Sequence, residues 1–404
     1  MELRFSEEEN AFRREVRSFF EDHLPARIHA RLLEHRSLAR EDIVTWQRTL
    51  NARGWATPSW PTEWGGPGWT PVQRYLFLDE LHQFPAPEPL SFNVSMIGPV
   101  IGTFGTDEQK ARFLARIANI DDWWCQGFSE PGAGSDLAAL STTAVRDGDH
   151  YIVNGTKMWQ GMGHRADWMF ALVRTDPTAE KKQAGISFLL IDMRTPGVTV
   201  QPIVTIDGRH EVNSVFLDDV RVPVANRVHE ENRGWDVAKF LLGNERTGIA
   251  RIGMSKHLLR RARAIAAEVP LRDATLAEDP AFRRRCAEIE AELRALEVTQ
   301  LRVLASQQAH SDKPDPRSSI LKVRGVELRQ AAAELMMRAA GPLAAVAEDE
   351  FAEPQPADEA GAGTPWAGTV SPVYFNLRAA SIYGGSTEVQ KNIIAQTVLG
   401  LPRA

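Results

Sequence analysis

Cysteine is nearly absent from this chain. The 404 residues include two cysteines, Cys125 and Cys286, which lie far apart and not in a metal-binding or redox spacing. That excludes a disulfide scaffold and is typical of a reducing cytoplasm. The ten histidines form no His-Glu-x-x-His pattern, so we expect no metal site.

Long apolar runs are also missing. No stretch of eighteen apolar residues occurs, and the charged segment Met1 to Asn10 lacks the apolar centre of a secretory signal. We therefore expect a cytoplasmic protein that does not span a membrane. The net charge of −6 and the pI near 6.0 argue against a nucleic-acid or anionic-membrane partner.

The period of the hydrophobic residues changes twice along the chain. Helical signals, such as Ser6 before three glutamates, continue to about residue 120. Shorter periods and the turn dipeptide Asp147-Gly148 then predict strands to about Val224. We predict an α+β fold with a helical domain over 1–120, a β sandwich or barrel over 121–232 and a helical bundle over 233–404. One bundle helix is expected over about 234–267 and further helices over 281–310, over 321–340 and after Ser386.

Two glycine-containing segments have the composition of ligand-binding loops. In the first, Glu130–Asp136, glycines allow close approach to backbone N–H groups and Ser135 adds a donor for a phosphate, although such a segment is equally often a turn. In the second, Gly384–Glu388, a helix follows a glycine turn and a Ser/Thr cap, which is either anion-binding geometry or ordinary capping.

Two single residues also stand out. Trp159, at the end of the segment Asn154–Trp159, has a side chain that stacks on flat rings or simply belongs to the core. Glu245 lies in a predicted helix, where its neighbours Leu241, Leu242, Gly248 and Ile249 are apolar or small. Desolvation of such a carboxylate favours a general base, but an ion pair with a basic residue explains the pattern as well.

Taken together and in this order, these segments resemble the acyl-CoA dehydrogenase family, and the resemblance covers essentially the whole chain. Glu130–Asp136 and Asn154–Trp159 resemble its two flavin motifs, Asp218–Pro223 the end of its β domain, and Ile382–Glu388 its C-terminal signature. The most similar subgroup is the large subunit of pimeloyl-CoA dehydrogenase. The resemblance implies helical, β and four-helix-bundle domains, with FAD between the last two.

The resemblance also implies roles for single residues. Ser129 would bond the pyrimidine edge of the flavin, beside the backbone of Phe128, and Trp159 would flank the isoalloxazine ring. The full implied cofactor set is Gln126, Phe128, Ser129, Gly134, Ser135, Trp159, Gly161, Ser386 and Glu388. The implied substrate set is Ser95, Arg246, Tyr383 and Gly384.

The sequence departs from the family pattern at three places, and these departures change the roles that the resemblance implies. Many members carry the catalytic glutamate directly after the tyrosine of the C-terminal signature, where this chain has Gly384. A smaller set places the base in a Glu-Arg pair on the first long bundle helix, and Glu245-Arg246 matches it. Gly161 stands where relatives often have threonine, and the usual Arg-x-x-Phe-Gly segment is missing around 271–282.

The implied reaction is FAD-dependent dehydrogenation of an acyl-CoA to the trans-2-enoyl-CoA, with Glu245 as base and a hydride passing to flavin N5. An electron-transferring flavoprotein would accept the electrons, and the assembly would be a homo- or hetero-tetramer with a sister subunit. The small and polar residues of the segment Ser91–Met96, where relatives line the acyl end, suit a longer, bulkier or ω-carboxylated chain, and a plain fatty acyl chain fits equally well. Alternatives are an FAD-binding subunit of a heteromeric enzyme, an oxidase or a desulfinase; a scaffold without ligand is the weakest.

Overall fold

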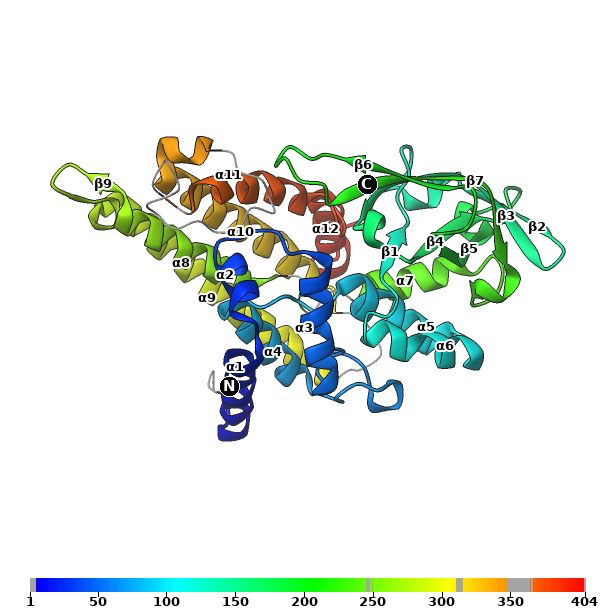
Figure 1. Ribbon diagram of the computed structural model, residues 1–404, viewed down its shortest axis with the longest axis horizontal. Coiled ribbons are helices and arrows are strands. Elements are labelled where there is room, and N and C mark those ends of the chain that lie inside the picture. The colour runs from blue at the N-terminus through cyan, green and yellow to red at the C-terminus, as the bar shows by residue number, and fades with distance from the viewer. Residues whose placement is uncertain are drawn as a thin grey trace. The chain divides into compact units, whose positions relative to one another are not determined.

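The computed structural model describes residues 5–244, 248, 250–309, 315–346, 364 and 366–402. The chain divides into two compact units. The helical unit comprises 1–42, 69–88 and 246–404, and the sheet unit comprises 43–68 and 89–245. Helices precede and follow a central sheet, as predicted (Figure 1).

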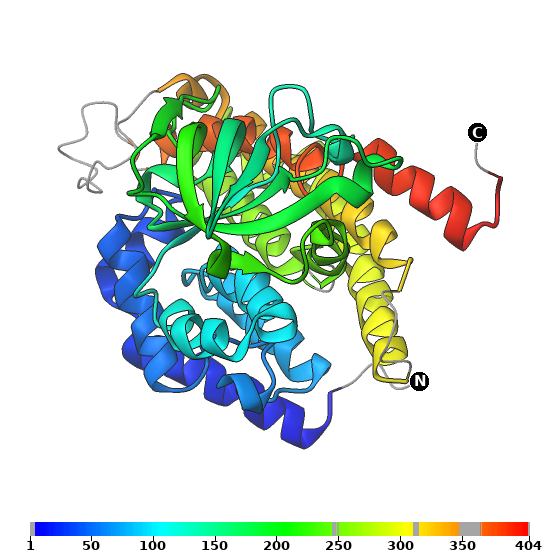
Figure 2. The ribbon, with the colours of Figure 1, turned by 90° about the vertical axis from the view of Figure 1, so that its right-hand side faces the viewer.

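The core of the sheet unit is one eight-stranded sheet with the order β6-β7-β3-β2-β4-β5-β8, in which β1 pairs with β4 (Figure 2). Its strands are β1 (Trp124–Gly127), β2 (Thr143–Asp147), β3 (His150–Gly161), β4 (Trp168–Arg174), β5 (Ile186–Asp192), β6 (Val198–Ile203), β7 (Val212–Pro223) and β8 (Arg227–Val228). The predicted hairpin at Asp147-Gly148 is confirmed, since β2 and β3 pair antiparallel around it. The sheet unit also holds α5 (Gly98–Phe104), α6 (Asp107–Ala118), α7 (Gly234–Asn244), the π-helix η2 (Phe92–Ile97) and most of α3 (Arg40–Ala52).

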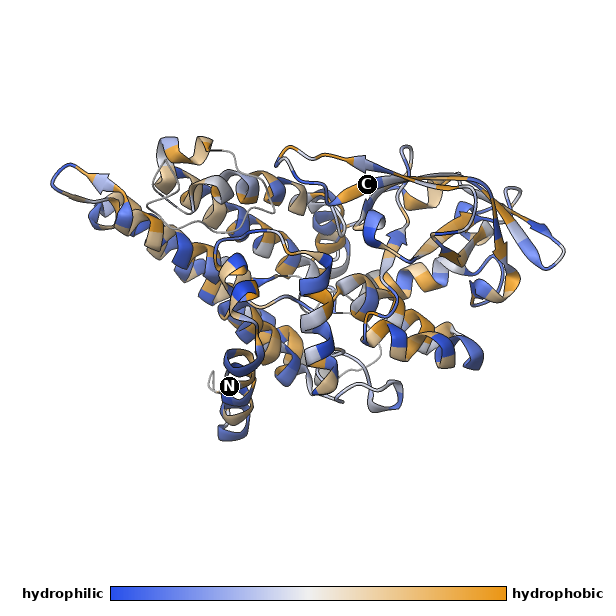
Figure 3. Cartoon of the chain, in the orientation of Figure 1, coloured by the Kyte–Doolittle hydropathy of each residue, from blue (hydrophilic) through white to orange (hydrophobic). Residues whose placement is uncertain are grey.

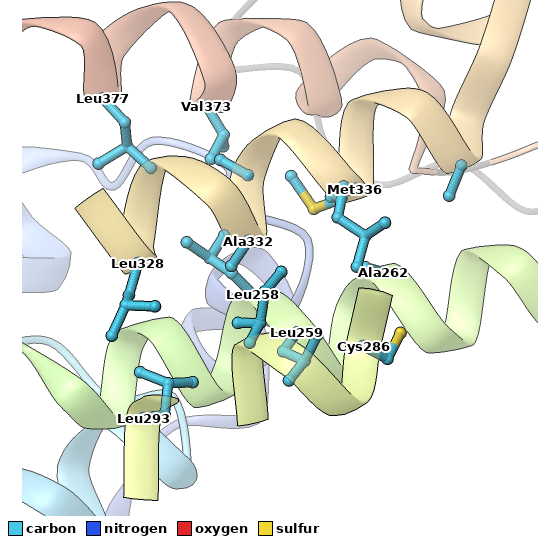
Figure 4. Close-up of a cluster of buried hydrophobic side chains, with 14 of the residues drawn as sticks. Leu258, Leu259, Ala262, Cys286, Leu293, Leu328, Ala332, Met336, Val373 and Leu377 are labelled. Atoms are coloured by element: carbon cyan, nitrogen blue, oxygen red, sulfur yellow. The ribbon is translucent and has the colours of Figure 1, made fainter. Parts of the chain in front are cut away.

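The helical unit is built around the packing of α8 (Ile252–Glu268), α9 (Pro280–Ala309), α10 (Ser318–Ala340) and α11 (Ala367–Asn376). Along these helices apolar positions alternate with polar ones (Figure 3), and buried side chains from all four meet in one core (Figure 4). Leu258 and Leu259 of α8 and Ala332 and Met336 of α10 all belong to this core. The unit also contains α1 (Glu7–His23), α2 (Ala26–Leu33), α4 (Pro71–Gln83), α12 (Thr387–Ile393) and a short hairpin, β9 (Pro270–Leu271) and β10 (Ala274–Thr275).

The helices predicted over 281–310, over 321–340 and after Ser386 are confirmed by α9, α10 and α12. The single helix predicted over 234–267 is wrong. The first helix, α7, ends at Asn244, Arg251 has a left-handed φ of 46°, and α8 begins at Ile252. Two glycines within eight residues, Gly243 and Gly248, each lower helix stability by about 1 kcal/mol relative to alanine, which favours a break here. Leu241 of α7 and Gly248, a bend before α8, therefore do not belong to one continuous helix.

No described helix is both long and apolar enough to cross a membrane.

Candidate active site

A buried ion pair joins the two segments of the sheet unit that resemble flavin motifs. Lys157 of β3 places its Nζ 2.7 Å from Oε1 of Glu130, and both side chains are almost fully buried. Lys157 also donates to the carbonyl of Leu172 at 2.6 Å. Glu130 in turn accepts hydrogen bonds from the backbone of Ser141 at 2.7 Å and of Thr142 at 3.0 Å. The pair thereby fixes the start of the 130–136 loop to the middle of the sheet.

Electrostatics keep Glu130 ionised despite its burial. Burial alone would raise its pKa, but the Lys157 ammonium and the hydrogen bonds from 141–142 outweigh that effect and lower the pKa to about 2. Removing the charge of either partner of this pair leaves the other charge buried and uncompensated.

The 130–136 loop itself is a tight turn. Glu130 and Ala133 exchange backbone hydrogen bonds of 2.9 and 3.1 Å, while Gly134 and Ser135 are exposed. A Cβ added at Gly132 or Gly134 would meet open space, so no packing within the described residues requires glycine there. Apart from its chain neighbours, no described atom lies within 4 Å of such a Cβ at Gly134, and the role of this residue in FAD binding stays a prediction.

Trp159 is exposed because β3 is irregular at this residue. The residue is 55% exposed and its backbone has a left-handed φ of 70°. The register with β7 steps from Met158 opposite Ser214 to Gln160 opposite Asn213, so Trp159 is an extra residue in a β-bulge. Its exposure excludes the alternative in which Trp159 is a core residue of the sheet unit.

Ser129 lies beside this bulge. Its carbonyl accepts a hydrogen bond of 2.9 Å from the N–H of Met158, which couples the end of β1 to the bulge. Gln126 lies in β1, half-buried, and Phe128 is buried just after it. The sheet unit therefore brings Ser129 and the Trp159 segment together.

Gly161, at the end of β3, accommodates a phenylalanine. A Cβ at Gly161 would lie 2.7 Å from the ring of Phe92, so the threonine of many relatives cannot enter unless that ring moves. Phe92 begins η2, which also carries Ser95, half-buried. π-Helical turns are rare and frequently occur at functional sites.

The C-terminal signature forms a glycine turn in the helical unit. Gly384 and Gly385 have left-handed φ values of 64° and 85°, and a Cβ at Gly385 would meet Gln390 at 2.4 Å. Ser386 caps α12 by accepting from the N–H of Val389 at 3.3 Å, and Glu388 is exposed in the first turn. In this unit Ser386 thus has the capping role that the sequence left open.

A buried lysine holds this turn. Lys322 of α10 donates from Nζ to the carbonyls of Ala380 at 3.0 Å and of Tyr383 at 2.9 Å. Its ammonium also lies 5.1 Å from the centre of the Tyr383 ring, and Tyr383 as a residue is 55% exposed. The turn that carries Tyr383 and Gly384 is therefore anchored to the bundle.

Two of the predicted site residues, Glu245 and Arg246, lie outside the described residues. Sequence reasoning gave no role to Lys157, Lys322 or Asn213. A signal for the two lysines exists: each interrupts an otherwise apolar or alternating stretch, and a buried lysine needs acceptors.

Models of three family domains match consecutive parts of the chain. These are the acyl-CoA dehydrogenase N-terminal domain over residues 6–121, the middle domain over 125–220 and the C-terminal domain over 232–399. The chain belongs to the acyl-CoA dehydrogenase family. It is an oxidoreductase with the three-domain fold of that family, and the family cofactor is FAD.

Two curated relatives match nearly end to end. The chain is 35% identical to acyl-CoA dehydrogenase IpdE1 of Mycobacterium tuberculosis over 401 residues, 97% of each protein. It is 34% identical to acyl-CoA dehydrogenase FadE26 of the same organism over the full length of both. The family assignment from the sequence is thus confirmed, while the pimeloyl-CoA dehydrogenase subgroup stays a prediction.

Two solved structures have the same fold over the full length of both chains. The ChsE4-ChsE5 complex from Mycobacterium tuberculosis superposes with a TM-score of 0.85 at 34% identity. The Tcur3481-Tcur3483 steroid ACAD superposes with a TM-score of 0.85 at 29% identity.

The residues present in the sheet unit fit FAD. An indole held outside the sheet by a bulge offers a flat ring for stacking, and the open space beside Gly134 and Ser135 suits a phosphate.

Proposed function

We propose that this chain removes the α-proton of an acyl-CoA thioester with Glu245 during dehydrogenation to the 2-enoyl-CoA. The observation that carries the proposal is Gly384, which leaves the C-terminal signature without a carboxylate where many relatives have one. Glu245-Arg246 matches the alternative placement of the base in the family.

The other residues position the reactants. The backbone N–H of Gly384, on a turn anchored by Lys322, donates to the thioester carbonyl and so increases the acidity of the α-hydrogen. Trp159 flanks the flavin ring, and Ser129 holds its pyrimidine edge. Bound FAD supplies the redox chemistry by accepting the hydride from Cβ.

The test is Glu245→Gln, with Glu290→Gln as a matched control, because Glu290 pairs with Arg263 on the surface at 2.6 Å. E245Q should keep the flavin spectrum but lose bleaching of the flavin by acyl-CoA, whereas E290Q should bleach like the parent. Full bleaching of E245Q would eliminate Glu245 as the base.

A second proposal is that a sister chain completes the FAD site. The Arg-x-x-Phe-Gly segment of the family is missing, and the chain instead forms the β9–β10 hairpin between α8 and α9. One structure of the same fold is the ChsE4-ChsE5 complex, and the other, the Tcur3481-Tcur3483 steroid ACAD, is likewise named for two proteins. FAD content and mass should be compared for the chain purified alone and with the product of a neighbouring acyl-CoA dehydrogenase gene. Stoichiometric FAD in the chain alone would contradict this proposal.

For the substrate we propose a bulky, ring-containing acyl group, in line with the steroid enzyme named above. The side chains of η2, including the half-buried Ser95, are the residues expected at the acyl end. Titration with steroid side-chain, ω-carboxylated and straight-chain acyl-CoAs should give the fastest flavin bleaching with the steroid thioester. Faster bleaching by either of the other two would overturn this choice.

The electron acceptor we propose is an electron-transferring flavoprotein. It should reoxidise the reduced enzyme faster than oxygen does, and the reverse order would favour the oxidase alternative.

A further inference from the structure

The exposed position of Trp159 has to be imposed on β3. Along this strand Tyr151, Val153 and Lys157 are buried at even spacings, so a regular strand would bury residue 159 on the same face. Instead Gln160 is buried and Trp159 is outside. The bulge therefore places Gln160 in the core and Trp159 outside it. A one-residue slip in the register of β3 would reverse these two positions.

The backbone conformation of Trp159 is unfavourable on its own. A left-handed φ is uncommon for residues other than glycine, and for a bulky residue it indicates a turn or strain that the surroundings must impose. The interactions on either side of Trp159 thus decide whether the indole stays outside.

A buried asparagine on the opposite strand supplies the contact after the bulge. Asn213 of β7 is fully buried and donates from Nδ2 to the carbonyl of Gln160 at 3.0 Å. Its Oδ1 accepts from Nε2 of His210 at 2.7 Å, and Nδ2 also faces Nδ1 of His164 at 3.3 Å. The amide thus uses both its donor and its acceptor, which neither alanine nor aspartate can do at this site.

Contacts before the bulge complete the arrangement. Gln160 turns its own Nε2 back to the carbonyl of Met158 at 2.9 Å, and the N–H of Met158 donates to Ser129. The carbonyl of Met158 therefore accepts from the side chain of Gln160, and the carbonyl of Gln160 accepts from the side chain of Asn213. Of these partners, Asn213 is the side chain from the opposite strand, and so it fixes the register.

We infer that Asn213 is a positioning residue for the flavin site: it locks the bulge that turns Trp159 out of the sheet toward the cofactor. This inference rests on the proposed role of Trp159 beside the flavin. It assigns a function to a side chain that does not itself touch the cofactor or the substrate.

The strand pair provides its own control. A second bulge lies between the same two strands, where the side chain of Asn154 donates to Oδ1 of Asp219 at 3.0 Å and Asp219 has a φ of 48°. Asp219→Ala loosens that bulge, which carries no predicted cofactor contact. Because Asp219 is exposed and Asn213 is buried, it should lower the melting temperature less than Asn213→Ala does, and it controls for loosening a bulge between these two strands.

The experiment compares N213A and D219A in the FAD-containing assembly and in the FAD-free protein. In the assembly, N213A should weaken FAD binding about tenfold beyond D219A, because a buried carbonyl loses its partner and the indole its fixed position. In the FAD-free protein, 5-fluorotryptophan NMR should show the Trp159 resonance, assigned by its loss in W159F, shifted or split in N213A and unchanged in D219A. Equal FAD affinity and an unchanged resonance in N213A would overturn the inference.

His210→Phe is the milder second variant, since it keeps a ring stacked on His164 but removes the donor to Asn213. It should shift the Trp159 resonance in the same direction, and if N213A does not fold, an unchanged resonance in H210F overturns the inference. Absence of FAD from the parent assembly would instead count against the proposed function, and the FAD-free NMR comparison would still decide the role of Asn213.

Discussion

Each unit has a buried lysine that holds a segment resembling a family motif, and the two lysines do so by different interactions. Lys157 in the sheet unit is neutralised by Glu130, in an ion pair whose partners come from the two flavin-type motifs. Lys322 in the helical unit donates to the carbonyls of Ala380 and Tyr383 at the C-terminal turn. The sheet thus fixes its cofactor motifs with paired charges, and the bundle fixes its turn with charge-assisted hydrogen bonds to backbone.

Removing the sheet lysine should have the largest effect. Lys157→Met leaves Glu130 buried without its partner, which should destabilise the sheet unit by about 3–5 kcal/mol. Urea unfolding followed by circular dichroism measures the loss, and FAD content should fall with it. The double variant K157M/E130Q removes both charges and should recover part of the stability; no recovery would mean that the ion pair is not the cause.

The next largest effect should come from lowering the pH, which acts on the helical unit through His257 and to a smaller extent on the sheet unit through His164, whose pKa burial lowers to about 4. Burial, with neighbouring Arg260 and Arg261, lowers the pKa of His257 from 6.5 to about 3. The unfolded chain therefore binds the proton more readily, so this contribution is complete above about pH 6.5 and is lost as the pH falls toward 3. Between pH 7 and pH 5 the helical unit should lose about 2 kcal/mol of stability.

His257→Phe should flatten this pH dependence. Urea unfolding of the parent and of H257F at a series of pH values is the measurement. Parallel curves for the two proteins would show that His257 is not responsible. The Glu130 carboxylate, whose pKa is held at about 2, should keep the sheet-unit ion pair intact over the same range.

The bundle lysine should give the smallest change in stability. Lys322→Met removes the donor to two backbone carbonyls and should cost about 1–3 kcal/mol. Its larger consequence should be functional: the rate of flavin bleaching by acyl-CoA should fall, because the turn that carries Gly384 loses its anchor. Thermal unfolding and rapid-mixing absorbance check the two parts. A stability loss as large as that of K157M would erase the contrast between the two lysines.

The sequence predicts regular elements well in this protein. Ser6 and the acids that follow it predict α1, and the Asp147-Gly148 dipeptide predicts the β2–β3 hairpin, because both signals are local. The break between α7 and α8 escapes a periodicity argument, since the apolar spacing continues across it while Arg251 adopts a left-handed backbone.

The site is less predictable because its supports are long-range. Trp159 can be singled out from its motif, but its exposure depends on a bulge that Asn213 holds from 54 residues away in the chain, the separation between positions 159 and 213. Lys157 and Glu130 likewise pair across 27 residues. Period-two alternation in the sequence indicates a strand, but it shows neither where the strand register shifts nor which distant residue pairs with a buried charge.

The central claim is that Glu245 removes the α-proton, and exchange of that proton with heavy water tests it most directly. Under anaerobic conditions the parent enzyme should incorporate deuterium at Cα of an acyl-CoA that it binds, and E245Q should show at least a hundredfold slower incorporation, in line with loss of a general base. Equal incorporation by parent and E245Q, measured by NMR of the recovered thioester, would contradict the claim.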